Sequence, residues 1–152
     1  MTGFRIFRFI AVPLSLLLLW SAYSGWWGLS LAENLYEIGP RGVRFCRESV
    51  CTWGGIDRLA TGDTWGLLGT TTLVSTTIAA CGMLFLGVAP AAKVRLVAKY
   101  VTGLCFFGLG LGVALAAKAP VVEGMRHTMA LAAYFIATGA GIGLGTVLSS
   151  RR

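Results

Sequence analysis

Hydrophobic residues gather in four long blocks along this 152-residue chain. Each block is long enough to supply the ~20 residues that a helix needs to cross ~30 Å of hydrocarbon. No Lys, Arg, Asp or Glu stands at the centre of any block. Because backbone N–H and C=O groups must be satisfied internally in lipid, blocks of this kind form helices. The expected helices cover roughly residues 9–29, 64–88, 97–117 and 128–148.

These blocks predict a single four-helix transmembrane domain over residues 1–152 and an all-α membrane protein. The chain is 56% hydrophobic and 12% charged, about half the charged fraction of typical soluble domains. A soluble protein would have to cover such helices with an outer layer. The segments between the blocks are too short to supply that layer, which argues against buried helices of a soluble domain.

Charged residues divide sharply between the connecting segments. All six acidic residues lie in the segments 30–63 and 118–127. The remaining segments contain basic residues and no Asp or Glu. Their basic residues are Arg5, Arg8, Lys93, Arg95, Lys99, Arg151 and Arg152. By the positive-inside rule, both termini and the short loop 89–96 are cytoplasmic, and the outer loop 30–63 is extracellular or periplasmic. The net charge of +7 then reflects orientation and attraction to anionic membrane lipid, and no nucleic acid is expected.

The first block resembles a signal peptide because basic residues precede an apolar run. The run is long for that role and ends in Gly25-Trp26-Trp27-Gly28, without a small-x-small cleavage site beside it. We therefore expect an uncleaved first helix. Trp26 and Trp27, with Trp65 at the start of the second block, are predicted to be interface aromatics at the headgroup level. Contact with a specific lipid or a pigment is the alternative.

Small residues recur at four-residue spacing in the last two blocks. Gly108 and Gly112 mark the third block, and Ala137, Gly141 and Gly145 mark the fourth. This spacing places small side chains on one helix face, where two backbones can approach closely in lipid. The stripes serve either packing inside the bundle or docking of a partner helix, and the sequence leaves both interpretations open.

Two cysteines in the outer loop predict a disulfide. Apolar and polar residues alternate on both sides of Glu48-Ser49, and a hairpin with its tip there places Cys46 opposite Cys51. Directly opposed residues have Cβ atoms about 4.5–5.5 Å apart, near the ~3.8 Å of a disulfide, and the outer compartment is oxidising. The expected fold thus includes a small disulfide-closed β-hairpin or sheet, with Arg44, Arg47 and Glu48 facing a partner.

Other uses of the cysteines are weaker interpretations. Zinc needs about four ligands, and only His127 could join them. Haem attachment needs C-x-x-C-H, which is absent. Membrane disulfide oxidases carry C-x-x-C and a second outer cysteine pair, whereas this chain has C-x4-C and places Cys81 and Cys105 inside helical blocks. We expect no catalytic residue, no metal and no cofactor.

The layout resembles the claudin and peripheral myelin protein superfamily, which includes tetraspan auxiliary subunits of ion channels and receptors. Trp26-Trp27-Gly28-Leu29 and the pair Cys46 and Cys51 are similar to the family signature of Trp, Gly-Leu-Trp and two cysteines, although Ser30 stands where the family has its second Trp. The stretch from Ala92 to Leu115 also looks like the start of a claudin third helix. The resemblance implies a small sheet above the bundle.

Function is predicted as that of a non-enzymatic tetraspan scaffold or accessory subunit. Its partners would be membrane lipid and other integral membrane proteins, bound through helix faces and the outer loop. The alternative is a small structural subunit of a large respiratory or photosynthetic complex that contacts lipid or pigment. A quinone-linked disulfide redox enzyme is a third and less favoured interpretation.

The charge distribution generates a topology prediction. In a variant without native cysteines, a single cysteine at Asp57 should react with an impermeant maleimide from outside, whereas one at Arg95 should not. Reaction at Arg95 in intact cells, with protection at Asp57, would reverse the orientation.

Overall fold

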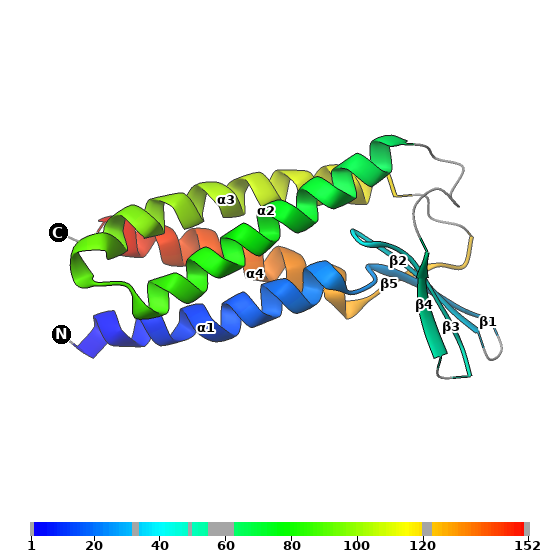
Figure 1. The fold of residues 1–152 in the computed structure, drawn as a ribbon, viewed down its shortest axis with the longest axis horizontal. Helices are drawn as coiled ribbons and strands as arrows, with labels where there is room; N and C mark the ends of the chain where they lie inside the picture. The colour runs from blue at the N-terminus through cyan, green and yellow to red at the C-terminus, as the bar shows by residue number, and fades with distance from the viewer. Residues whose placement is uncertain (1, 32–33, 49, 55–62, 120–122, 151–152) are drawn as a thin grey trace.

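The computed structural model describes residues 2–31, 34–48, 50–54, 63–119 and 123–150. Within these residues four helices pack side by side, and five antiparallel strands form a sheet beyond one end of the bundle (Figure 1). The helices are α1 (Thr2–Tyr23), α2 (Asp63–Val88), α3 (Ala91–Ala117) and α4 (Met129–Ser150). The strands are β1 (Trp27–Leu31), β2 (Asn34–Gly39), β3 (Gly42–Arg47), β4 (Val50–Gly54) and β5 (Arg126–His127).

Three helices are long and apolar enough to cross a bilayer. Their apolar segments are Thr64–Val88, Ala92–Ala117 and Met129–Ser150. In α1 the described apolar segment, Phe9–Tyr23, is shorter. Large apolar side chains also point outward, as at Phe85 and Phe106. A helix that is apolar on both its inner and outer faces is typical of a membrane span, so the fold is that of a membrane protein.

The ends of the bundle differ. The start of α1, the end of α4 and the connection between α2 and α3 lie together at the end opposite the sheet (Figure 1). That connection is short, because α3 begins at Ala91 rather than near residue 97. Pro90 precedes α3 as its N-cap, where proline's missing N–H costs nothing. Because α3 includes Lys93 and Arg95, it is longer than the helix predicted from the apolar block 97–117.

The first helix ends at Tyr23 rather than near residue 29, which corrects the sequence-based boundary. A Cβ added to Gly25 would lie 2.5 Å from the Cβ of Glu37, so the chain can pass here only without a side chain. The Trp26 N–H then donates to the carbonyl oxygen of Ile38 at 2.7 Å. Pairing with β2 therefore replaces the last helical turns, and Trp27 to Leu29 belong to β1.

The small sheet expected in segment 30–63 is present, and the segment between α3 and α4 also contributes a strand to it. The strand order is β4-β3-β2-β1-β5. Strand β5 comes from the second outer segment and pairs Trp27 with His127 and Gly28 with Arg126. The β2–β3 turn contacts the bundle, because a Cβ at Gly69 of α2 would clash with the carbonyl oxygen of Pro40. The sheet is thus fixed to the helices at two places.

The small residues of α4 that the sequence singled out face the interior of the bundle. Ala137, Gly141 and Gly145 are buried. A Cβ on Gly145 would lie 2.8 Å from the carbonyl oxygen of Ala98 in α3, and one on Gly141 would lie 2.7 Å from the Cys105 sulfur. These glycines are therefore placed where α4 and α3 approach most closely.

A buried tyrosine fills the space beside the small residues of α3. The Tyr134 ring lies against Gly112, where an added Cβ would be 2.5 Å from a ring carbon, and its hydroxyl reaches Gly108. That hydroxyl donates to the carbonyl oxygen of Gly108 at 2.8 Å and lies 3.2 Å from the Thr76 hydroxyl. One polar group therefore joins α2, α3 and α4. Such interhelical hydrogen bonds contribute on the order of 0.6–2 kcal/mol in lipid.

The helix contacts generate a matched pair of substitutions. Gly145→Ala should lower the melting temperature in detergent, because overpacking at a backbone contact costs about 1–3 kcal/mol. Gly143→Ala is the control, since nothing lies within 4 Å of its added Cβ and alanine favours helix by ~1 kcal/mol. Equal melting temperatures for the two variants would contradict close packing of α3 and α4 at Gly145.

Candidate functional site

The β3–β4 hairpin carries the residues that the sequence assigned to the outer loop. Its register pairs Cys46 with Cys51 and Arg47 with Val50, which confirms the predicted hairpin. Glu48 has a φ of 47°, the left-handed conformation that a two-residue hairpin turn requires. The alternation of the sequence therefore determined both the position of the turn and the pairing of the cysteines.

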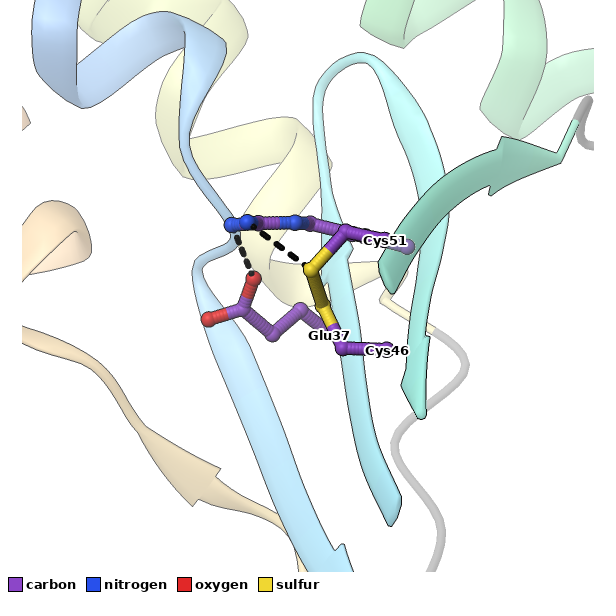
Figure 2. The surroundings of a disulfide bond; sticks show 4 residues. Glu37, Cys46 and Cys51 are labelled. Atoms are coloured by element: carbon purple, nitrogen blue, oxygen red, sulfur yellow. Dashed lines mark hydrogen bonds and ion pairs between the residues drawn. A yellow bond between two sulfur atoms is a disulfide. The ribbon is translucent and has the colours of Figure 1, made fainter. Parts of the chain in front are cut away.

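The predicted disulfide joins Cys46 and Cys51, with their Cα atoms 4.0 Å apart. Cys46 is buried in the sheet, whereas Cys51 is exposed. The guanidinium of Arg44 donates to the Cys51 sulfur at 3.3 Å (Figure 2). The disulfide is therefore a structural link between neighbouring strands, covered on one side by a charged residue.

Arg44 makes contacts within the sheet, although the sequence placed it on a partner-facing surface. Its Nη1 donates to Glu37 Oε2 at 3.0 Å, and its guanidinium lies 5.9 Å from the centre of the Trp53 ring. Arg41 stacks over the same ring at 5.1 Å. Arg44 thus ties β2, β3 and β4 together, an arrangement that the sequence analysis missed because the β2 register was not predicted.

Arg47 and Glu48 are exposed at the turn of the hairpin. Their side chains are 71% and 69% exposed, and they approach each other at 3.9 Å. A surface pair of this kind contributes little to stability. Val50, on the other side of the turn, is 70% exposed. The hairpin tip therefore presents an apolar residue next to two charges, on a rigid base closed by the disulfide.

The three tryptophans predicted as interface aromatics are buried instead. Trp26, Trp27 and Trp65 are 0%, 2% and 2% exposed, so they cannot lie among lipid headgroups. The indole N–H of Trp26 donates to the carbonyl oxygen of Ser21 at 2.9 Å. The rings fill the junction between bundle and sheet, a burial that only the tertiary fold could produce.

The aromatic side chains that do reach the surface near this junction are different ones. Trp20 is 53% exposed and Tyr23 is 43% exposed. The Tyr23 hydroxyl lies 3.2 Å from the Thr77 hydroxyl of α2. These two residues have the exposure and the polar groups that suit a headgroup layer.

Titratable and thiol groups outside the hairpin are dispersed. His127 stacks against Trp27 at 6.0 Å between ring centres, and Cys81 and Cys105 are free thiols on α2 and α3. Among the described residues, no three His, Cys, Asp or Glu side chains gather in a metal-binding arrangement.

The chain matches no known protein-family model, no curated protein and no solved structure.

A prediction about the disulfide follows from its place between β3 and β4. Replacing Cys46 and Cys51 together with Ser should leave the helices inserted, because insertion depends on helix hydrophobicity. Opening so small a ring costs about 2 kcal/mol, so amide hydrogen exchange in β3 and β4 should accelerate roughly 30-fold.

The control is Cys81→Ser, which removes a thiol that forms no disulfide. It should leave exchange in the sheet unchanged. If the double variant exchanged as slowly as the parent, the disulfide would not be what holds the hairpin.

Proposed function

We propose that this chain is a non-enzymatic, four-span membrane scaffold or accessory subunit. In this proposal α1 is the fourth span, both termini are cytoplasmic, and the sheet lies outside. The basic residues at the start of α3 and the placement of α1's start beside α4's end, opposite the sheet (Figure 1), support this orientation. The partners would be other integral membrane proteins.

The observation that carries the proposal is the hairpin tip. Arg47, Glu48 and Val50 project at the turn that is remote from the Pro40 contact with α2. The disulfide and the Arg44 contacts hold this tip in one conformation, so little entropy is lost when it binds. An exposed apolar residue flanked by charges suits a protein interface, where charges set specificity and association rate.

The outward helix faces provide a second surface for partners. Gly139 and Gly143 of α4 have open space where a Cβ would be, in contrast to the buried stripe of Ala137, Gly141 and Gly145. The small residues therefore divide between packing inside the bundle and an outer face. We propose that the outer face contacts lipid or a neighbouring helix.

A distant relation to the claudin and peripheral myelin protein superfamily is part of the proposal. A disulfide-closed sheet above the helices is the layout that this resemblance implies. The alternative, a pigment-contacting subunit of an energy-converting complex, loses support because Trp26, Trp27 and Trp65 are buried. Their rings are not available on a surface.

Site-specific cross-linking tests the role of the tip. A photoreactive amino acid at Val50 should capture an integral membrane protein in intact cells, identified by mass spectrometry. Arg47→Glu should reduce that adduct several-fold, because it reverses the charge next to the contact. Lys118→Glu, an exposed basic residue at the end of α3, is the matched control and should have no effect.

Two results would contradict the proposal. One is an adduct that persists undiminished in Arg47→Glu. The other is a quinone-dependent redox activity of the purified chain that disappears when Cys46 and Cys51 are replaced, which would make the disulfide catalytic.

A further inference from the structure

One transverse row of residues crosses the sheet from β5 to β3. The register pairs Arg126 with Gly28, Gly28 with Glu37, and Glu37 with Arg44. Directly paired residues in antiparallel strands project from the same face of a sheet. Gly28 has no side chain, so the row has a gap between the cation of Arg126 and the carboxylate of Glu37.

The gap is part of a cleft of about 450 Å³. This volume lies in the range of small-ligand sites, roughly 300–1,000 Å³. The lining includes Gly28, Leu35, Glu37, Arg126 and Thr128. The segments before α2 and before α4 therefore both line the cleft. Leu35 is apolar, whereas Glu37 and Arg126 carry opposite charges.

The two charges that flank the gap have unused capacity. Glu37 uses Oε2 for Arg44 at 3.0 Å. Its second oxygen points away from that contact, over β1, in Figure 2, and meets no donor among the described residues. Arg126 is exposed. Among the described residues it forms no ion pair with an acidic side chain. A ligand in the gap can therefore meet an acceptor on one side and a cation on the other.

We propose that this cleft binds a small zwitterion, with its ammonium group at Glu37 and its phosphate at Arg126. The backbones of these residues are two inter-strand steps apart, about 9.6 Å, and each side chain can hold a ligand group through a charge-assisted hydrogen bond. An ammonium and a phosphate joined by a two-carbon chain form a compact ligand that offers one charged group to each side chain. The site is independent of the partner-binding role proposed for the hairpin tip.

A phospholipid headgroup is the source that the location favours. Thr128 borders the cleft and directly precedes α4, whose membrane-crossing segment starts at Met129. The headgroup layer of a bilayer lies just beyond the end of such a segment. Leu29 and Leu35 in the lining provide an apolar contact for the glycerol and the first acyl carbons. The same chemistry could also reach the cleft as a soluble phosphoethanolamine.

Three variants test the site by different means. Gly28→Leu fills the gap, and the fold should tolerate it because an added Cβ meets no atom closer than 3.6 Å, the Thr128 methyl. Arg126→Ala removes the exposed cation, and Glu37→Gln removes the carboxylate charge. Gly103→Leu, in α3 at a position where an added Cβ meets nothing within 4 Å, is the matched control for a large side chain at a glycine.

The measurement is native mass spectrometry of the purified full chain titrated with phosphatidylethanolamine or phosphatidylglycerol. The parent and Gly103→Leu should bind phosphatidylethanolamine at least tenfold more tightly than each of the other three variants. Phosphatidylglycerol, which has no ammonium, should bind the parent at least tenfold more weakly than phosphatidylethanolamine. Size-exclusion profiles establish that each variant is folded, and Arg126→Ala changes only a surface side chain.

Calorimetric titration with phosphoethanolamine distinguishes the source. Weak or absent binding of the soluble compound, beside tight lipid binding, supports a lipid site. Comparable binding of both supports the same zwitterion chemistry with a soluble source. Equal lipid binding by the parent and all three cleft variants, or equal binding of the two lipids, would overturn the proposal.

Discussion

The structure depends most on the passage of the chain from α1 into β1 at Trp26. The Trp26 ring is fully buried and lies 4.7 Å from the Tyr134 ring of α4. Its backbone N–H donates to Ile38 of β2, and its carbonyl oxygen accepts from Thr128 before α4. Trp26 thus joins the sheet to the bundle, and its indole N–H donates to the Ser21 carbonyl oxygen, one of the groups that the end of a helix leaves without an intrahelical partner. The orientation of the sheet above the helices follows from this junction.

Below the junction, the bundle relies on close backbone contact and a few buried hydroxyls. Helices in lipid have no hydrophobic driving force for association. Their association relies instead on close packing at glycines and on interhelical hydrogen bonds. Gly145 and Gly141 bring α4 against α3, and Tyr134 links three helices through one hydroxyl. Ser15 adds a bond from α1 to the carbonyl oxygen of Ala80 in α2 at 2.9 Å. Such a bundle is a rigid support for the sheet.

Above the junction, the sheet separates two proposed tasks. The tip at Arg47 to Val50 is remote from the bundle and is held by the disulfide, which suits contact with another protein. The gap over Gly28 lies beside the start of α4, close to the membrane surface, which suits a lipid headgroup. Glu37 and Arg44 connect the two regions, because their ion pair spans β2 and β3.

The sequence by itself determined the apolar helices, the position of the β3–β4 turn and the pairing of Cys46 with Cys51. These depend on composition and short-range alternation, which are local properties. Gly39-Pro40-Arg41-Gly42 also carries a local signal for the β2–β3 turn. Only the tertiary structure decided that Trp26 and Trp27 are buried, that Arg44 pairs with Glu37, and that Arg126 lies across Gly28 from Glu37. Those contacts join segments up to about a hundred residues apart, so they depend on how the sheet packs on the helices and leave no trace in local pattern.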